Sequence, residues 1–325
     1  MTRYFLGADL GATNTRIVIT DGDGQALGFG RSGPGNHEVV GYAGFQANLQ
    51  QAVGRALASA GLQADQISGA GFGIAGYDWP PQAEPIQQVI RSLHLSGPFE
   101  LVNDVELGLL AGSERGWGVA LGSGTGCNCR GWDASRTRRG QVTGGGAMYG
   151  EFAGASELIW MAMRAVAYEW TGRGPATRLS AALVERYAVQ DLEQLLQDSM
   201  CQKIEINAAD APLVFQVAAE GDPVALELIR WAGRELGAMA LTVIRQLGFE
   251  GLEFDLVQIG SLFEGSPLLT EELKAVVHAA APAARFIRLA APPIMGAVLL
   301  GMSAAGLQPG KALRERLTAS LRAGG

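Results

Sequence analysis

The chain has 325 residues, of which 48% are hydrophobic and 18% charged, and its formal net charge is −7. This length favours two domains over a single core, and the composition is typical of a well-packed globular protein. Because an acidic chain offers no basic face to a nucleic-acid backbone, we expect no nucleic-acid partner.

The amino-terminal segment has no leader of the secretory type, since Asp9 interrupts its first hydrophobic run. Residues 289–310 carry no charge, but they contain two adjacent prolines and four glycines. They therefore predict a buried helix rather than a membrane span. The 3 cysteines do not form a disulfide framework. We expect a cytoplasmic protein that does not bind membranes.

The first predicted element is a hairpin over residues 4–31, with a turn rich in glycine and small hydroxyl residues. This turn reads Leu10-Gly11-Ala12-Thr13-Asn14-Thr15. Glycine is the compositional outlier, with 46 residues, and we expect many of them in such turns. A polar loop (32–37), a helix (44–60) and a buried strand (67–76) are predicted next. They are followed by a helix (85–93), a short strand (99–104) and a helix (105–111).

A second copy of the glycine-hydroxyl hairpin begins near residue 117. Its turn reads Leu121-Gly122-Ser123-Gly124-Thr125-Gly126. Glycine lets the backbone approach a ligand closely, and turn N–H groups with Thr or Ser hydroxyls suit phosphate oxygens. Two such turns that face each other across a cleft would hold a polyphosphate from both sides.

Helices dominate the remainder of the chain, from residue 153 to residue 247. The last predicted elements are a buried strand (255–261), an amphipathic helix (268–279), a short strand (286–289) and the uncharged helix (294–305). Strands that alternate with helices predict an α/β protein with mixed sheets flanked by helices. Residues 113–116 are the best boundary between the two halves.

Transfer of a phosphoryl group to a hydroxyl requires positioning, charge neutralisation and a group that accepts the hydroxyl proton. Asp104 is the natural base, because it follows an apolar strand and opens a helix; the alternative is that it only caps this helix. Asp9 suits metal binding, with capping of the hairpin as the alternative. Cys127 and Cys129 face the same way on one strand, but two ligands do not make a zinc site, so we expect buried or cleft-lining thiols.

These motifs resemble, in their order and spacing, the sugar kinase, hsp70 and actin superfamily. More closely, the chain is similar to the N-acetylglucosamine kinase branch of the BadF/BadG/BcrA/BcrD ATPase family. The segments that carry the resemblance are residues 7–15, 35–37, 102–104, 121–130 and 148–151 and, more weakly, 259–261 and 293–297.

The resemblance implies two ribonuclease-H-like (actin-like ATPase) domains with a cleft between them. The first would span residues 1–116 and regain a carboxy-terminal helix at about 294–325. The second would span residues 117–293 and carry a helical insertion. A homodimer is also expected from the resemblance alone.

The resemblance also implies that ATP and Mg²⁺ occupy the cleft together with a sugar. The nucleotide would contact Gly11, Thr13, Asn14, Gly122, Ser123, Gly124, Thr125, Gly260 and Ser261. Asp9 would organise Mg²⁺ through water. The sugar would contact Asn36, His37, Asn103, Asp104, Asn128, Gly145, Gly146 and Glu151.

The chain departs from the family pattern near the sugar. Gly144-Gly145-Gly146 replaces the usual Gly-Trp-Gly, and Glu151 replaces a shorter acid. Ser261 stands where a second glycine is usual at the adenosine turn. The sequence therefore indicates phosphate handling more strongly than it indicates which sugar is bound.

The leading hypothesis is an ATP-dependent kinase that phosphorylates a hydroxyl of an amino sugar. N-acetylglucosamine, converted to its 6-phosphate, is the first candidate, and glucosamine or another hexose is the alternative. An ATPase that activates a dehydratase or reductase is a second class, but its relatives use a Cys-Ala-Ala-Gly-Thr-Gly context that this chain lacks. A non-catalytic sugar sensor is a third, but related regulators usually carry an amino-terminal DNA-binding module, whereas this hairpin begins almost at residue 1.

Overall fold

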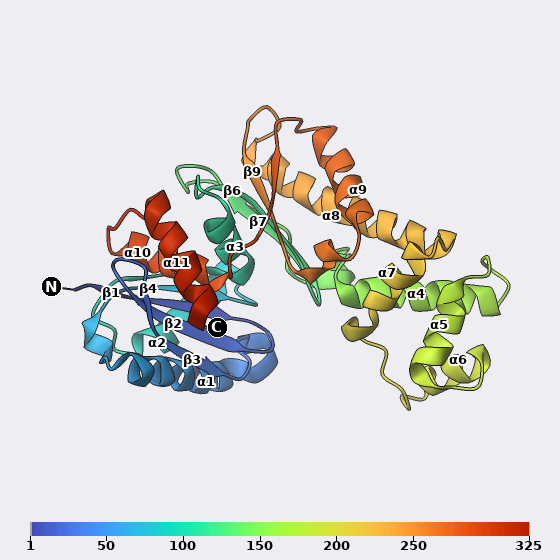
Figure 1. Cartoon of the computed structure of the whole chain (residues 1–325), viewed down its shortest axis with the longest axis horizontal. Coiled ribbons are helices and arrows are strands. Elements are labelled where there is room, and N and C mark those ends of the chain that lie inside the picture. Colours follow the sequence, from blue (N-terminus) through green and yellow to red (C-terminus); the bar gives the residue numbers. More distant parts are fainter. Residues whose placement is uncertain (1, 325) are drawn as a thin grey trace.

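The chain folds around two five-stranded mixed sheets, each flanked by helices (Figure 1). The structure is a computed structural model, and it describes residues 2–324. The predicted α/β class, with two mixed sheets covered by helices, is confirmed. The division of the chain at residue 116 stays a prediction.

The first sheet has the strand order β3-β2-β1-β4-β5. Its strands are β1 (Tyr4–Leu10), β2 (Thr15–Asp21), β3 (Ala26–Ser32), β4 (Ile67–Ile74) and β5 (Phe99–Asn103). Strands β1, β2 and β3 pair antiparallel, whereas β4 lies parallel to β1 and to β5. The parallel strands place the carboxyl ends of β1, β4 and β5 at one edge, which is the edge where a ligand is expected to bind.

Helices cover both faces of the first sheet. Helices α1 (His37–Ala60) and α2 (Ala83–Arg91) lie on one side, and α10 (Ile294–Ala304) and α11 (Lys311–Gly324) lie on the other (Figure 1). The uncharged segment thus forms α10, which packs on β1 and β4. Among residues 2–324, no helix is long and apolar enough to cross a bilayer.

Strand glycines explain how closely these helices approach the sheet. A Cβ atom at Gly71 of β4 would lie 2.1 Å from the carbonyl oxygen of Ala297 in α10. A Cβ atom at Gly30 of β3 would lie 1.9 Å from the carbonyl oxygen of Ala52 in α1. The expectation that the glycine excess belongs to turns is therefore incomplete, because part of it allows helices to contact the sheet backbone.

The second sheet has the strand order β10-β9-β6-β7-β8. Its strands are β6 (Gly118–Ser123), β7 (Cys127–Trp132), β8 (Arg139–Gln141), β9 (Asp255–Ile259) and β10 (Arg285–Arg288). Helices α8 (Pro223–Leu247) and α9 (Pro267–His278) pack against each other beside this sheet. Helix α3 (Asp104–Gly112) contacts strands of both sheets and so lies at their junction.

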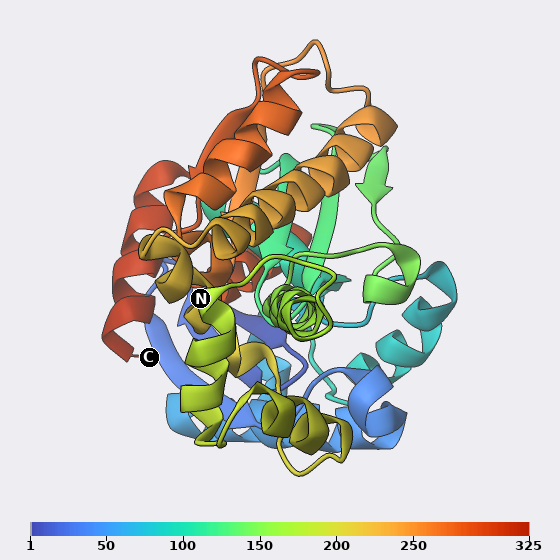
Figure 2. The ribbon, with the colours of Figure 1, turned by 90° about the vertical axis from the view of Figure 1, so that its right-hand side faces the viewer.

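The remaining helices lie within residues 153–247, the region predicted to be mostly helical. They are α4 (Ala155–Trp170), α5 (Arg178–Tyr187), α6 (Leu192–Met200) and α7 (Pro212–Ala219). Figure 1 shows them at the end of the molecule far from α10 and α11, and Figure 2 views the molecule from that end.

Three details differ from the sequence expectations. The carboxy-terminal return consists of two helices, α10 and α11, rather than one. The predicted polar loop ends one residue early, because α1 begins at His37 and the Asn36 side chain accepts the Glu38 N–H as its cap. The short strand β8 was not expected, since three residues carry too little pattern to predict a strand.

Candidate active site

A cavity of about 490 Å³ is lined by the turn of the second glycine-rich hairpin and, on the other side, by Asp9 of β1, just before the turn of the first. Polar residues from both halves of the chain line it. Those that the sequence analysis singled out are Asp9, Asn36, Asp104, Gly122, Ser123, Gly124, Thr125, Asn128 and Gly260. The other residues singled out lie in the turn of the first hairpin, behind the cavity wall, in the loop at 143–151 or, for Ser261, at an exposed position after Gly260.

The first hairpin, between β1 and β2, closes on itself. The Gly11 N–H donates to the Asn14 carbonyl at 2.9 Å, and the Gly35 N–H donates to the Gly11 carbonyl at 2.9 Å. Thr13 and Asn14 are exposed at the tip of this hairpin, and they are not among the residues that line the cavity. This arrangement leaves the Thr13 hydroxyl accessible to a ligand.

The second hairpin, between β6 and β7, is held by α4. The N–H groups of Ala155 and Ser156, in the first turn of α4, donate to the carbonyls of Gly124 and Thr125 at 2.8 and 3.0 Å. The buried Ser123 hydroxyl donates to the Ala153 carbonyl at 2.6 Å. The Ser123 side chain is therefore occupied within the protein, and the Thr125 side chain is the exposed hydroxyl of this turn.

Gly260 follows β9 and touches the second hairpin. Its backbone has φ 106° and ψ 155°, a conformation that is essentially restricted to glycine. A Cβ atom at this position would lie 2.0 Å from the Ser123 carbonyl oxygen. Only glycine therefore allows the turn after β9 to pack against the hairpin. Ser261, the next residue, is exposed and does not line the cavity.

Asp104 reaches the cavity from the first turn of α3. Asn103 is the N-cap of this helix, and its side-chain oxygen accepts the Val105 N–H at 3.1 Å. The Asp104 carboxylate accepts the same N–H at 2.9 Å. Since Asn103 performs the capping, Asp104 is not needed for that purpose, and its second oxygen remains for a ligand.

Asn103 itself does not line the cavity. It is buried, and its side-chain N–H groups donate to the Tyr77 carbonyl and to the Asp78 carboxylate, both at 3.2 Å. The structure thus places Asn103 behind Asp104, where it orients the amino end of α3. Direct contact between a sugar and Asn103, as the resemblance implied, does not fit this placement.

Two carboxylates in the cavity hold protons more tightly than usual. Burial raises the pKa of Asp104 to about 7, and the nearby Asp9 and Asp78 carboxylates add to the rise. The Val105 N–H and the Arg130 guanidinium oppose it. Burial also raises the pKa of Asp9 to about 6, against the influence of Arg16. A carboxylate with a pKa near neutrality suits proton transfer at physiological pH.

Asn128 contributes a polar group without a hydrogen-bond partner to the cavity. It lies near the start of β7, and its side-chain oxygen is buried with no hydrogen-bond partner among residues 2–324. Buried polar atoms rarely lack a partner, so this oxygen is placed to accept a hydrogen bond from a bound molecule. Asn36 also lines the cavity, although its oxygen caps α1.

His37 lies beneath the cavity wall instead of in it. Its ring is buried, stacks on Tyr42 with centroids 4.8 Å apart, and has Nε2 at 3.3 Å from the side-chain nitrogen of Gln82. Burial lowers its pKa, although Glu38 and Asp78 oppose this effect. The neutral ring supports the start of α1, and the predicted sugar contact through His37 does not fit this position.

Glu151 organises the loop that departs from the family pattern. Its carboxylate accepts four hydrogen bonds, from the Thr143 N–H and hydroxyl at 2.5 and 2.6 Å and from the N–H groups of Gly144 and Gly146 at 3.2 and 3.0 Å. Glu151 is buried, and neither it nor Gly145 nor Gly146 lines the cavity. The longer acid is thus turned into its own loop and away from a ligand.

Asp78 is a cavity residue that the sequence analysis missed. It follows β4 in the loop before α2, and its buried carboxylate pairs with Arg130 of β7 at 2.5 Å. An acid two residues after the Gly76 turn at the end of a buried strand is a signal that could have identified it. Together with Asp9, Glu38 and Asp104, Asp78 is one of four carboxylates from the first half of the chain that line the cavity.

The metal ligands that the residues could supply are few. Within residues 2–324 no group of three or more His, Cys, Asp or Glu side chains is arranged to bind a metal ion. Mg²⁺ usually takes one or two carboxylates together with water and substrate phosphates, and Asp9 supplies a carboxylate to the cavity. The thiols of Cys127 and Cys129 do not compete, since burial raises the pKa of both.

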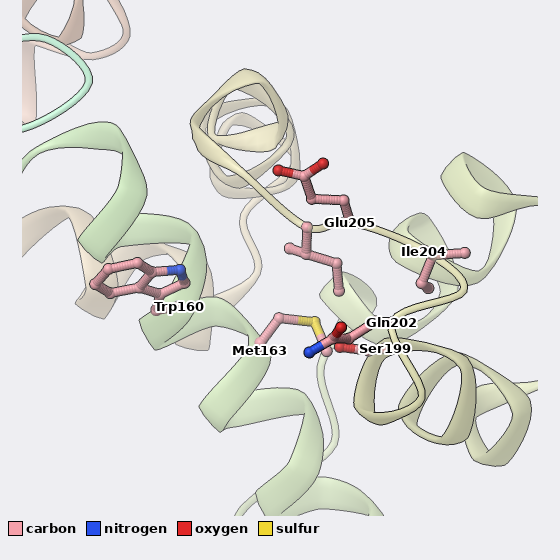
Figure 3. Close-up of a pocket in the computed structure, with 7 residues that line it drawn as sticks. Trp160, Met163, Ser199, Gln202, Ile204 and Glu205 are labelled. Atoms are coloured by element: carbon pink, nitrogen blue, oxygen red, sulfur yellow. The ribbon is translucent and has the colours of Figure 1, made fainter. Parts of the chain in front are cut away.

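A second, larger cavity lies far from these groups. It measures about 660 Å³ and lies between α4 and the segment after α6 (Figure 3). Trp160 and Met163 of α4 face Gln202, Ile204 and Glu205 across it. It contains neither glycine-rich hairpin and only one carboxylate, so the smaller cavity is the better candidate for an active site.

Comparison with known proteins identifies one family and two relatives that match almost the whole chain. The model of the BadF/BadG/BcrA/BcrD ATPase family matches residues 6–301. The chain is 25% identical to an N-acetylmuramic acid/N-acetylglucosamine kinase of Clostridium acetobutylicum, over 93% of this chain and 99% of that protein. It is also 25% identical to an N-acetyl-D-glucosamine kinase of Dictyostelium discoideum, over 92% of this chain and 98% of that protein.

Solved structures agree on the fold. A candidate N-acetylglucosamine kinase from Chromobacterium violaceum superimposes with a TM-score of 0.67 at 22% identity, over 92% of this chain and 98% of that chain. The chain therefore shares its fold with that protein over most of its length.

Proposed function

Since this chain belongs to the BadF/BadG/BcrA/BcrD ATPase family, we propose that it is an ATP-dependent sugar kinase whose substrate is an amino sugar. N-acetylglucosamine, phosphorylated on its 6-hydroxyl, is the first candidate, because two relatives with nearly full coverage carry this sugar in their names. Glucosamine or another hexose is the alternative.

One observation carries the proposal. Asp104, whose carboxyl has a pKa of about 7, lines the same cavity as the unpartnered Asn128 oxygen and the second glycine-rich hairpin. A hydroxyl that donates to Asp104 would lie in the same cavity as phosphates held by this hairpin. Such a meeting of base, acceptor and phosphate site is what phosphoryl transfer to an alcohol requires.

In the proposed mechanism, Asn128 accepts a hydrogen bond from one sugar hydroxyl and so orients the ring. Asp104 accepts the proton of the hydroxyl that attacks, and it performs this task only as a carboxylate. The Thr13 hydroxyl, exposed on the first hairpin, donates to the transferred phosphoryl group. The second hairpin and the Gly260 turn hold the rest of the nucleotide.

Asp9 is the residue proposed to hold Mg²⁺. The ion would supply charge neutralisation for the phosphates when it is bound. Glu151 and Asn103 act indirectly in this proposal, since Glu151 shapes the loop at residues 143–146 and Asn103 orients α3. The homodimer and the cytoplasmic location remain expectations from the sequence.

The first test is a coupled ADP-release assay with ATP and Mg²⁺ over a panel of sugars. The panel contains N-acetylglucosamine, N-acetylmuramic acid, glucosamine and glucose, and mass spectrometry with NMR identifies the phosphorylated position. We expect the fastest release with N-acetylglucosamine. If every sugar binds without releasing ADP, the chain is a sensor and the kinase proposal fails.

The second test removes the base. Asp104→Asn should lower kcat by about 10³-fold, because general-base catalysis contributes this order of acceleration. Nucleotide affinity, measured with a fluorescent ATP analogue, should change less than threefold. Asp65→Asn, at an exposed aspartate before β4, is the matched control and should keep full activity. Turnover of Asp104→Asn within a few fold of the parent would remove Asp104 from the mechanism.

A further inference from the structure

A buried ion pair connects the two sheets beside the candidate active site. The guanidinium of Arg130, on β7 of the second sheet, donates to the Asp78 carboxylate after β4 of the first sheet at 2.5 Å. Arg130 is 5% exposed and Asp78 is 8% exposed. The pair therefore joins residues of separate sheets in a place that water hardly reaches.

Further hydrogen bonds tie this pair to its surroundings. The Gln141 side chain of β8 accepts from Arg130 at 2.9 Å and donates to the Asp78 carbonyl at 3.1 Å. Asn103, the cap of α3, donates at 3.2 Å to the Asp78 carboxylate oxygen that also accepts from Arg130. A continuous series of contacts thus runs from β7 through Asp78 to Asn103, and Asp104 is the next residue.

Strand geometry connects the other end of this series to the cavity. Side chains two residues apart on a strand point to the same face, so Arg130 and Asn128 share one face of β7. Asn128 lines the cavity, and so does Asp104. The ion pair therefore connects β7, which carries Asn128, to the start of α3, which carries Asp104.

Stability alone is a poor reason for such a pair. Removing two charges from water costs several kcal/mol, and replacing a buried pair with apolar residues is often neutral or stabilising. A buried pair at a junction does, however, restrict the relative position of the two elements that it joins. The pair would then contribute to the geometry of the site, where a small displacement of β7 relative to α3 changes the distance between Asn128 and Asp104.

We infer that Asp78 and Arg130 are positioning residues, whose ion pair holds the cleft face of β7 against the amino end of α3. A sugar hydrogen-bonded to Asn128 then presents its hydroxyl to Asp104. This inference rests on the proposed kinase function. It assigns no chemical step to either residue, because both charges are used on each other.

The kinetic test compares two charge-removing variants and their combination. Asp78→Asn and Arg130→Gln should each lower kcat/KM for the sugar by about 100-fold, since a misplacement of about 1 Å costs this order of rate. The affinity for the ATP analogue should change less than threefold. The double variant should also lose about 100-fold rather than the product of the two losses, because both changes break one connection.

A matched control separates positioning from stability. Arg186 pairs with the buried Asp210 at 3.0 Å in the helical insertion, far from the cavity. Asp210→Asn also leaves an arginine without its buried partner, so it should lower the melting temperature but keep kcat/KM for the sugar within threefold. Equal kinetic losses in Asp210→Asn and Asp78→Asn would overturn the inference.

A structural readout keeps the inference testable whatever the substrate is. Hydrogen exchange measured by mass spectrometry should become faster in residues 103–108 and 127–132 of Asp78→Asn, and stay unchanged there in Asp210→Asn. Unchanged exchange in both segments would overturn the inference even if the parent protein phosphorylates no sugar in the panel. A parent without turnover but with the expected exchange pattern would instead reject the proposed function alone.

Discussion

The two glycine-rich hairpins share a sequence pattern but differ in what surrounds them. The first exposes Thr13 and Asn14 and is closed by its own backbone and Gly35. The second is fixed by the amino end of α4, by the Ser123 to Ala153 hydrogen bond and by the close approach of Gly260. One hairpin is therefore free to contact a ligand through its side chains, and the other is built into the domain.

This difference shows that a repeated motif does not imply repeated roles for equivalent side chains. The hydroxyl of Thr13 is accessible, whereas the hydroxyl of Ser123 already has a protein partner. We expect changes in the second hairpin to act through stability and backbone position. Changes in the first should act on turnover and leave stability unchanged. Five predictions test this division and the role of the cavity carboxylates.

The largest effect is expected at the turn that supports the second hairpin. Gly260→Ala places a Cβ atom 2.0 Å from the Ser123 carbonyl oxygen and forces alanine into φ 106°. Binding of the fluorescent ATP analogue should become undetectable, and the free energy of unfolding in urea should fall by about 3 kcal/mol. Gly251→Ala, with no atom within 4 Å, is the control and should change stability by less than about 0.5 kcal/mol. Normal nucleotide binding by Gly260→Ala would show that the turn does not shape the hairpin.

The first hairpin should respond in the opposite way. Thr13→Val keeps the shape of the side chain but removes its hydroxyl, so kcat/KM for ATP should fall by about 100-fold if this donor contacts the transferred group. Because Thr13 is exposed, the urea midpoint should not move. Thr242→Val, at an exposed threonine that bonds only within its own helix, should leave both quantities unchanged. A loss of stability without a loss of activity in Thr13→Val would contradict the division.

Both cavity carboxylates with a raised pKa, Asp9 and Asp104, come from the first half of the chain. Asp104 acts as a base only when deprotonated, so kcat/KM for the sugar should rise with pH and level off above about pH 7. At one pH unit below this value the rate should be about tenfold lower. A profile that is flat between pH 5 and pH 8 would contradict the assignment.

The same shift has an effect on stability with a definite sign. Between the ordinary pKa of 3.8 and the folded value of about 7, folded Asp104 keeps a proton that the unfolded chain releases. Raising the pH through this window therefore lowers the free energy of unfolding. Asp104→Asn should remove this slope and be more stable than the parent at pH 8, by on the order of 4 kcal/mol. Urea titrations at pH 5 and pH 8 measure the difference.

The smallest kinetic effect is expected for the second hairpin's own hydroxyl. Ser123→Ala leaves the buried Ala153 carbonyl without its partner and should lower the free energy of unfolding by about 1–3 kcal/mol. We expect kcat/KM for ATP to stay within about fivefold of the parent, because the hydroxyl is not free for a phosphate. A loss as large as that of Thr13→Val would place Ser123 in direct contact with the nucleotide and erase the contrast between the hairpins.

The sequence by itself determined the α/β class, the helical insertion and the two hairpins. These depend on local patterns, namely apolar runs, helical periodicity and the glycine-hydroxyl turns, which one segment carries without its neighbours. Asp104 could also be identified, because a carboxylate between a buried strand and a helix is a local signal. The cleft between the two sheets was expected from the family resemblance, and the match over residues 6–301 confirms that resemblance.

Only the tertiary structure decided which of these polar side chains are free. Ser123, Asn103, His37 and Glu151 all match a motif, yet the side chain of each is already bonded to another part of the protein. Asp78 and Arg130, 52 residues apart, meet only because the two sheets come together. A hydrogen bond depends on where both partners lie in space, and a one-dimensional pattern specifies the donor or the acceptor but not the atom that will satisfy it.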